Sequence, residues 1–264
     1  MGFIRDRKYF FGGRAQKAYE FLGRRFADVE DWRFMNYGYG FADPTQNITL
    51  QPEDEAERYC AQLYHVVASQ VDLKGKAVLD VGSGRGGGAS YIHRYLGPKS
   101  TTGMDLAESA VEFCRKVYEE TAGLSYQQGN AMEMPFEDGT FDAVTNVESS
   151  HCYPDKARFF AEVLRVLKPG GNFLYTDFTD ANRPGDDLLE KAGFADLNET
   201  DVTAEIIRGL EQDEARRREQ IRQQVPFGFR KLTGLWAGTT NSWIYRDFVE
   251  GRRKYRVFRA TKSA

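Results

Sequence analysis

One short stretch, Ala77–Ile92, limits what this chain can fold into more than any other feature. It reads AVLDVGSGRGGGASYI, so apolar residues around Asp80 lead straight into a glycine cluster and then into a helix-compatible run. A strand, a glycine loop and a helix in this order let the backbone approach a nucleotide-like cofactor closely. The stretch therefore predicts an α/β fold with a cofactor loop after its first strand.

Two classes of cofactor use such a loop. Gly82, Gly84 and Gly87 satisfy the G-x-G-x-x-G pattern of dinucleotide-binding proteins, and the stretch also satisfies the G-x-G-x-G pattern of S-adenosylmethionine (SAM) enzymes. We expect Asp80 at the loop mouth, where its carboxylate would repel a diphosphate held at the helix N-terminus. SAM carries an ammonium and a sulfonium and has no phosphate, so the acid favours SAM. A tight turn without a ligand is the alternative.

Length and charge set broad limits. The 264 residues suit one large α/β domain, or such a domain with a helical addition. The formal net charge of −3 predicts no general affinity for nucleic acid, although residues 205–264 carry fourteen Lys or Arg against seven Asp or Glu. That basic stretch could meet an acidic lipid or substrate, and a solvated helix face is the simpler interpretation.

The cysteines and histidines do not predict a disulfide framework or a metal site. Cys60, Cys114 and Cys152 are odd in number and lack C-x-x-C spacing, and the three histidines are scattered without ligand spacing. No apolar run approaches the ~18 residues of a transmembrane helix, and the N-terminus lacks the apolar core of a signal peptide. We therefore expect a reduced, cytoplasmic protein without a metal.

Hydrophobic periodicity predicts helices and strands in alternation from residue 53 onward. The predicted strands cover residues 77–80, 101–104, 124–128, 141–145, 172–178, 194–202 and 254–261. The predicted helices cover residues 53–71, 89–96, 106–120, 156–167 (closed by KPGG), 187–192 and 204–224. Such alternation implies a mostly parallel, doubly wound sheet.

Two further sites follow the second and third predicted strands. Asp105 lies twenty-three residues after Gly82, close to the ~20-residue offset at which an acid accepts ribose hydroxyls. It could also cap the next helix, and the two roles are compatible. Asn130 and Ala131 supply a short polar and a small residue that could border an adenine ring, or they could simply form a turn.

Five segments in fixed order carry a specific resemblance. They read VLDVGSGRGGG, GMDLAESA, QGNAMEMPF, FDAVTNVESSHCYPD and EVLRVLKPGG. Together they resemble the class I SAM-dependent methyltransferases over roughly residues 53–200. The resemblance implies a Rossmann-like, seven-stranded sheet of order 3-2-1-4-5-7-6 with strand 7 antiparallel. We expect a helical N-terminal extension over residues 1–52, and a methyltransferase domain over 53–264 with a helical insert at about 204–250.

The resemblance also implies a set of cofactor-binding residues and SAM as the cofactor, with S-adenosylhomocysteine as its product. Carried over by motif, the residues that would line the methionine end are Asp80, Gly82, Ser83 and Gly84. Asp105 and Leu106 would hold the ribose, and Asn130 and Ala131 would border the adenine. Asn146 would face the cofactor after the fourth strand.

A narrower resemblance concerns the acceptor. VDLKGKAVLDV, GGGASYI and NVESSHCYP are similar to O-methyltransferases acting on polyketide-derived lipids of the phthiotriolone dimycocerosate type, and sugar O-methyltransferases share the ES-x-H pattern. The resemblance implies a small-molecule or lipid-like acceptor. No basic–aromatic motif predicts a nucleic-acid partner, although the basic stretch keeps one open, and a homo-oligomer is possible.

An alcohol or phenol acceptor must lose a proton during methyl transfer, and His151 is the candidate base. It follows the fourth strand, and its ordinary pKa near ~6.5 suits that role. Asp177 ends the fifth strand, and in this topology the two strands are neighbours, so its carboxylate could orient the imidazole. The alternative is a structural histidine before Pro154. Glu148 could help bind the sulfonium, or it could satisfy nearby backbone donors.

Other interpretations remain open at this point. Tyr37 and Tyr39, within NYGYG, could close over the site as a lid hinged at their glycines, or they could belong to the core. The chain is 14% aromatic, which suits SAM-dependent C-methylation of an olefinic, prenyl or sterol-like substrate through a cationic intermediate. A non-catalytic SAM-binding protein is another possibility, and NAD-dependent chemistry is disfavoured by Asp80.

Overall fold

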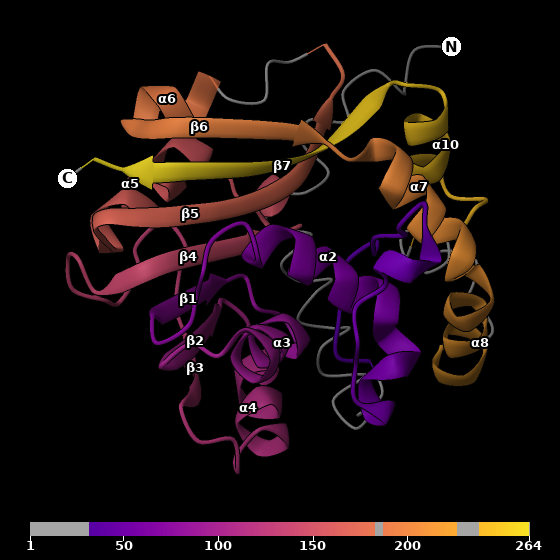
Figure 1. The fold of residues 1–264 in the computed structure, drawn as a ribbon, viewed down its shortest axis with the longest axis horizontal. Coiled ribbons are helices and arrows are strands. Elements are labelled where there is room, and N and C mark those ends of the chain that lie inside the picture. Colours follow the sequence, from indigo (N-terminus) through magenta and orange to yellow (C-terminus); the bar gives the residue numbers. More distant parts are fainter. Residues whose placement is uncertain (1–31, 183–186, 226–237, 264) are drawn as a thin grey trace.

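The structure is a computed structural model, and it describes residues 32–182, 187–225 and 238–263. Its strands are β1 (Ala77–Val81), β2 (Ser100–Asp105), β3 (Leu124–Gln128), β4 (Phe141–Val147), β5 (Leu167–Asp180), β6 (Phe194–Asp201) and β7 (Arg253–Lys262). They form a seven-stranded sheet of order β3-β2-β1-β4-β5-β7-β6 (Figure 1). β7 is antiparallel to β5 and β6, and the other pairs are parallel. The predicted topology is therefore confirmed.

Helices cover both faces of this sheet. They are α2 (Arg58–Ala68), α3 (Gly87–Leu96), α4 (Glu108–Val117), α5 (Lys156–Val166), α6 (Asp187–Ala192), α7 (Thr203–Gln212), α8 (Glu214–Gln224) and α10 (Trp243–Val249). Successive β1 residues serve opposite cores, because strand side chains alternate between faces. Val78 belongs to the core cluster that contains residues of α2, α3, α7 and α10, whereas Leu79 belongs to the one that contains residues of α5 and α6.

Three predicted elements differ in their details. The helix predicted over 53–71 begins as the 3-10 helix η3 (Pro52–Glu57), and regular α-helix starts only at α2. The helix predicted over 204–224 is two helices that meet at Asp213, whose buried carboxylate pairs with Arg216 and Arg217. The KPGG segment, predicted to close a helix, already belongs to β5, which begins directly after α5.

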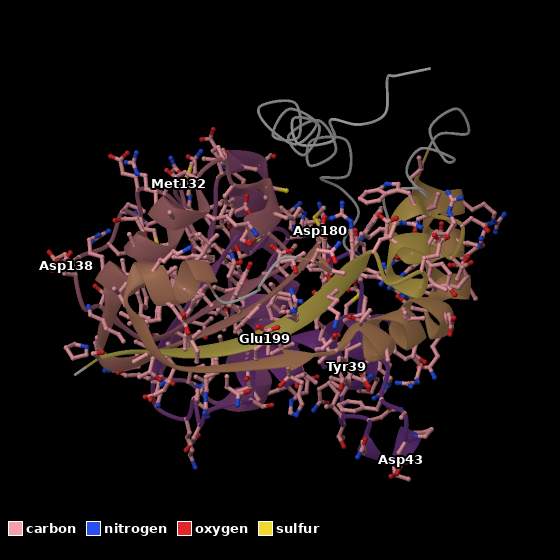
Figure 2. The ribbon with its side chains drawn as sticks, turned by 90° about the horizontal axis from the view of Figure 1, so that it is seen from above. Tyr39, Asp43, Met132, Asp138, Asp180 and Glu199 are labelled. Atoms are coloured by element: carbon pink, nitrogen blue, oxygen red, sulfur yellow. The ribbon has the colours of Figure 1, made fainter. Side chains whose placement is uncertain are left out.

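The N-terminal extension was predicted to be helical over residues 1–52, of which 1–31 lie outside the described residues. The described part, residues 32–52, contains no α-helix. Residues 32–41, which we call the N-terminal strap, contain no helix, and the 3-10 helix η2 (Pro44–Gln46) follows them. The predicted helical insert comprises α7, α8 and α10 in its described residues, with 226–237 outside them. Strap and insert gather near one end of the sheet in Figure 1, and Figure 2 shows Asp138 at the left edge of the molecule, far from Tyr39.

Backbone hydrogen bonds fix the strap to the helices around it. The N–H of Tyr39 donates to the carbonyl of Tyr59 at 2.8 Å, and the N–H of Gly40 donates to the carbonyl of Glu205 at 3.0 Å. Gly209 of α7 lies directly against the strap, since a Cβ on it would be 3.0 Å from the carbonyl carbon and oxygen of Gly38. The strap and α7 therefore approach so closely that a side chain at position 209 would push their backbones apart by a few tenths of an ångström.

We expect Gly209→Ala to destabilise the protein. Alanine in a free helix interior would stabilise by up to about 1 kcal/mol. Here the added methyl group meets backbone atoms that cannot move independently, so we expect a net loss of about 1–3 kcal/mol. Urea unfolding followed by circular dichroism measures the change. An increase in the free energy of unfolding would contradict the close packing of strap and helix.

Candidate functional site

The glycine loop joins β1 to α3 at the carboxyl edge of the sheet. The N–H groups of Gly82 and Ser83 both donate to the carbonyl of Met104 at the end of β2, at 2.8 and 3.0 Å. The N–H of Gly84 donates to Oδ2 of Asp105 at 2.8 Å. Among the described residues, a Cβ on Gly84, whose φ is +53°, would meet only one atom within 4 Å, the sulfur of Met35 at 3.7 Å. The loop is thus tied to β2 and leaves space over Gly84.

The start of α3 is already covered by protein, which argues against a diphosphate. The first helical amide, that of Gly87, donates to the carbonyl of Arg33 in the strap at 3.1 Å. The Tyr64 ring packs so closely on Gly88 that a Cβ there would lie 1.8 Å from its Cζ. A diphosphate bound at a helix N-terminus needs those amides and that space. The geometry therefore favours a cofactor without phosphates.

Asp80 does not stand at the mouth of the loop, so that expectation is wrong. Its side chain is fully buried and accepts hydrogen bonds from Thr145 Oγ1 at 2.7 Å and Tyr64 OH at 3.4 Å. Burial raises the pKa of Asp80 to about 7, so a full negative charge is not assured at neutral pH. The preference against a dinucleotide rests on the covered start of α3 instead.

Two buried polar atoms near the loop are unsatisfied within the described part of the chain. These are the hydroxyl oxygen of Ser83 and the amide oxygen of Asn146. Buried polar atoms are normally hydrogen-bonded, so a ligand that bonds to them would complete the site. The amide nitrogen of Asn146 donates to the carbonyl of Val81 at 2.9 Å and to Ser149 Oγ at 2.6 Å, which fixes its orientation. These residues fit a SAM site.

The predicted ribose and adenine residues have protein partners of their own. Asp105 accepts from the N–H of Gly84 and, at 2.9 Å, from that of Ala107, while Ala107 itself is the N-cap of α4. The N-cap alternative for Asp105 is therefore wrong. Leu106 beside it is an exposed apolar side chain. Asn130 Oδ1 accepts from the N–H of Met132 at 3.0 Å, so the predicted turn is present. The cofactor roles of these residues, and of buried Ala131, stay predictions.

His151 and Asp177 meet at the carboxyl ends of β4 and β5. His151 lies on the 3-10 helix η4 (Ser150–Cys152), and Asp177 lies one residue beyond the last pairing of the two strands. The ring Nδ1 is 2.9 Å from Oδ1 of Asp177, and the backbone N–H of His151 donates to Oδ2 at 2.8 Å. The Phe178 ring packs against the imidazole, with centroids 4.5 Å apart. The predicted contact is confirmed, while its catalytic role stays a prediction.

The charges of this pair are strongly coupled. Asp177 is fully buried, and burial opposes its ionisation, but the cations of His151 and Lys156 hold its pKa well below the ordinary value. Burial alone would lower the pKa of His151, and the Asp177 carboxylate outweighs it and raises that pKa to about 10. At neutral pH the pair is therefore an imidazolium and a carboxylate, rather than a neutral imidazole with an ordinary pKa.

Glu148 anchors the strap beside this pair. It follows β4 with a φ of +50°, a left-handed conformation that costs energy in a non-glycine residue. Its Oε1 accepts from the backbone N–H of Tyr37 at 2.8 Å and from Tyr255 OH at 2.7 Å. Burial raises the pKa of Glu148 to about 7. The carboxylate thus satisfies a backbone donor, as one of its two predicted roles requires, and a role toward the sulfonium stays a prediction.

Tyr37 packs among aromatic rings beside the site, as the core alternative requires, and its role as a lid stays a prediction. Its ring packs against Phe178 and Phe248 at 5.9 and 6.1 Å between centroids. Arg217 of α8 donates to the Tyr37 carbonyl at 2.9 Å, so this charged helix is hydrogen-bonded to the strap. Gly38 permits close packing, since a Cβ on it would be 3.0 Å from that of Tyr59.

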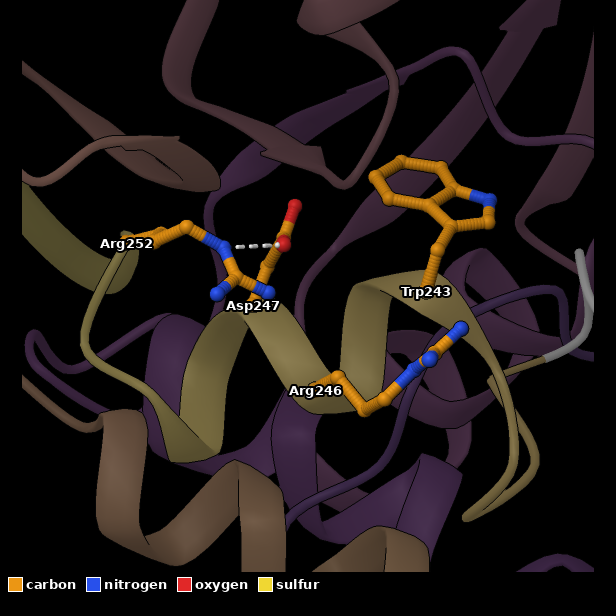
Figure 3. Close-up of a pocket in the computed structure, with 4 residues that line it drawn as sticks. All are labelled: Trp243, Arg246, Asp247 and Arg252. Atoms are coloured by element: carbon orange, nitrogen blue, oxygen red, sulfur yellow. Dashed lines mark hydrogen bonds and ion pairs between the residues drawn. The ribbon is translucent and has the colours of Figure 1, made fainter.

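A surface pocket lies close to the rings of Phe178 and Phe248. It is lined by Trp243, Arg246, Asp247 and Arg252, and Figure 3 shows Arg252 paired with Asp247 while Arg246 points away from them. The Arg253 guanidinium lies over the rings of both Trp243 and Phe178, at 5.2 and 5.4 Å. Arg253 therefore contacts both Trp243, which lines this pocket, and Phe178, which packs against His151.

Several functional contacts were missing from the sequence interpretation. Sequence spacing gave no signal for Tyr64, Arg217 or Glu57, whose carboxylate accepts from the strap amides of Arg33 and Phe34. Ser150 and Lys156, which contact Asp177, lie within five residues of His151, so their closeness in sequence could have identified them.

In the ranges that the structure describes, no group of three or more His, Cys, Asp or Glu side chains could hold a metal ion. Within those ranges, no helix is long and apolar enough to cross a bilayer.

Known proteins with similar sequences cover nearly the whole chain. A family model described as a methyltransferase domain matches residues 79–175. The chain is 40% identical over 258 residues to the fatty-acid O-methyltransferase of Mycolicibacterium smegmatis, covering 95% of this chain and 91% of that protein. It is 38% identical over 235 residues to the phthiotriol/phenolphthiotriol dimycocerosates methyltransferase of Mycobacterium tuberculosis, covering 87% and 85%.

Solved structures share the fold at lower identity. The [4+2]-cyclase SpnF superimposes with a TM-score of 0.74 at 22% identity, covering 95% of this chain and 96% of that one. Geranyl diphosphate C-methyltransferase from Streptomyces coelicolor gives a TM-score of 0.67 at 18% identity, covering 92% and 97%. At such identities the likeness supports the fold and leaves the chemistry to the site residues.

We expect the His151 ring to titrate well above pH 6.5, near pH 10, in the ligand-free protein. In Asp177→Asn, the midpoint should fall to 6.5 or below, because burial then acts without the carboxylate. Nitrogen-15 NMR of the imidazoles measures both midpoints, with His65 as the internal control.

The sign for stability follows from the same titration. A folded-state pKa above the unfolded value near 6.5 stabilises the fold below pH 6.5, and that contribution is lost as pH rises toward 10. An unshifted wild-type midpoint would contradict the coupling.

Proposed function

The chain belongs to the SAM-dependent methyltransferases, and from this premise we propose that it methylates an oxygen atom of a small-molecule or lipid-like acceptor, with His151 as general base and Asp177 orienting it. The observation that carries the proposal is the His151–Asp177 contact at the carboxyl edge beside the glycine loop. A lipid-like acceptor is supported by the relatives, which are named for a fatty acid and for phthiotriol dimycocerosates.

The residues around the glycine loop would hold the cofactor. Ser83 and Asn146 would hydrogen-bond to it with their unsatisfied oxygens, and Gly84 would allow its close approach. Asp105 and Leu106 would border the ribose, and the residues that would border the adenine are Asn130 and Ala131. When bound, SAM supplies an electrophilic methyl group on a positively charged sulfur.

The protein's own contribution is positioning, water exclusion and proton removal. Asp177 holds Nδ1 of His151, so Nε2 is the nitrogen that would take the proton from an acceptor hydroxyl as its oxygen forms the bond to the methyl carbon. Phe178 packs against the ring and Tyr37 packs against Phe178, and the two would limit access of water. Alignment of this kind is worth up to about 7–11 kcal/mol, and a general base typically contributes about 10²–10⁴-fold.

The charge on His151 sets a clear pH requirement. Its pKa of about 10 means that the ring is protonated at neutral pH, so it must lose a proton before it acts as a base. Another cation brought close to the ring would lower that pKa by repulsion. With a hydroxyl acceptor, the rate should therefore rise with pH until the ring is neutral.

A carboxylate acceptor is the second candidate, and the charged state of His151 favours it. A fatty-acid carboxylate is already ionised at neutral pH, so methylation of its oxygen needs no base. An imidazolium beside Asp177 would then attract the acceptor instead of deprotonating it. The two candidates differ in how the rate depends on pH, because only the hydroxyl reaction requires the ring to be neutral.

Replacing the pair tests the proposal. With a hydroxylated lipid as acceptor, we expect His151→Ala and Asp177→Asn to lower kcat by about 10²–10⁴-fold while the affinity for SAM stays intact. Transfer of labelled methyl groups and calorimetry with SAM measure the two quantities. His93→Ala is the control, since its ring bonds to the carbonyl of Ala122, away from the pair.

Other outcomes would redirect the proposal. Unchanged turnover in both variants excludes the pair as the base. Fatty-acid methylation that does not increase between pH 6 and 9 favours the carboxylate candidate. A new C–CH₃ signal in the product NMR spectrum, in place of O–CH₃, indicates C-methylation. SAM binding without any methylated product from alcohols, phenols, acids and olefins indicates a binding protein.

A further inference from the structure

The Asp177 carboxylate receives more donors than the orientation of one imidazole requires. Oδ1 accepts from His151 Nδ1 and from the N–H of Phe178, each at 2.9 Å. Oδ2 accepts from the N–H of His151 and from Ser150 Oγ, and Lys156 Nζ is 3.7 Å from it. Two cationic side chains therefore face one fully buried carboxylate.

Lys156 comes to this carboxylate from a separate element. It is the first residue of α5, whose N-cap is Asp155. Its side chain is 26% exposed, and its Nζ is 3.5 Å from Tyr175 OH, which in turn bonds to Ser150 Oγ at 2.7 Å. The lysine is thus held in place near Asp177, and its charge is only partly screened by solvent.

The two cations do not have the same function at a buried carboxylate. With His151 alone as counter-ion, loss of the ring proton would leave Asp177 buried and uncompensated, which is costly. A second cation keeps the carboxylate compensated after that proton has gone, and it also repels the proton on the ring. The second cation therefore allows a state in which Asp177 is ionised and the imidazole of His151 is neutral.

We propose that Lys156 is a positioning residue of the reaction, which compensates Asp177 when His151 releases its proton to solvent and so lets the neutral ring take the acceptor's proton at Nε2. The proposal rests on the proposed role of His151 as a base.

Other ionisable groups face the pair from the elements packed around it. They are Glu148 after β4, Cys152 on η4, Tyr175 on β5, Tyr255 on β7 and Tyr37 on the strap. Burial raises the pKa of each of these three tyrosines, so they stay neutral where a base would work. Glu148, whose pKa burial raises to about 7, favours the charged ring and thus opposes Lys156. Arg253 of β7 is a further cation on this side, and its guanidinium lies over the Phe178 ring at 5.4 Å. Besides His151, Lys156 is the described cation whose nitrogen lies within 4 Å of the Asp177 carboxylate.

The experiment compares Lys156→Met and Lys156→Arg in the full chain. We expect the methionine variant to raise the His151 midpoint, measured by nitrogen-15 NMR without ligands, by about one unit. The acid limb of kcat/KM against pH, measured with a hydroxylated lipid, should move by the same amount. At pH 7 this is about a ten-fold loss, with the high-pH plateau retained. The arginine variant should behave like the wild type.

A matched control separates this effect from the loss of any lysine. Lys168 makes a similar ion pair, with Asp142 at 2.8 Å, on another part of the sheet. Lys168→Met should leave both the midpoint and the profile unchanged. Melting temperature and S-adenosylhomocysteine binding confirm that each variant is folded, and Lys156→Gln replaces the methionine variant if that one is not.

Three results would overturn the proposal. One is an unchanged His151 midpoint in the methionine variant. Another is an equal loss of kcat/KM at every pH, which marks a structural role. The third is a shifted midpoint with an unshifted pH profile, which also removes His151 as the base. If His151→Ala loses turnover while the methionine variant does not shift, the proposed function stands and the role of Lys156 fails.

Discussion

The site is organised around a charge that has no contact with solvent. Asp177 lies near the end of a central strand with no exposed surface, and its ionised form exists because donors from β5, η4 and α5 converge on it. The parallel pairing of β4 and β5 places η4 within reach, so the sheet register decides which side chains can meet the carboxylate. An anion buried without such partners would be protonated instead.

A second constraint is the way in which the strap closes the same edge of the sheet. Its amides bond to Glu57 and Glu148, its carbonyls accept from Gly87, Arg85 and Arg217, and none of these contacts is local in sequence. The strap thereby joins the glycine loop, the end of β4 and α8. The glycine loop and the residues beside His151 therefore contact the same backbone segment, so a disturbance of the strap should affect both sides of the site.

Much of the fold was readable from the chain because its signals are local. Apolar runs ending in glycine or acid mark the strands, and the ordered motifs carried the strand order. The break at Asp213 was hidden, because Arg216 and Arg217 at spacings of three and four look like ordinary helix support. The site was readable where neighbouring strands bring residues together, as for His151 and Asp177. The burial of individual polar side chains could not be predicted from the sequence. Asp80 was therefore expected at the mouth of the loop, whereas it lies buried beneath it.

Burial also changes how the pair of His151 and Asp177 would act on an acceptor. In water, an imidazole titrates near neutrality and serves as a base without help, but beside a buried carboxylate it holds its proton tightly. The pair is then closer to a stable ion pair than to a reactive base. Deprotonation of a hydroxyl therefore requires nearby positive charge that lowers the pKa of the ring. Lys156 and the positive charge of bound SAM would both act in the required direction, whereas Glu148 would act against them. Whether the acceptor is a hydroxyl or a carboxylate therefore depends less on the identity of His151 than on the sum of charges around it.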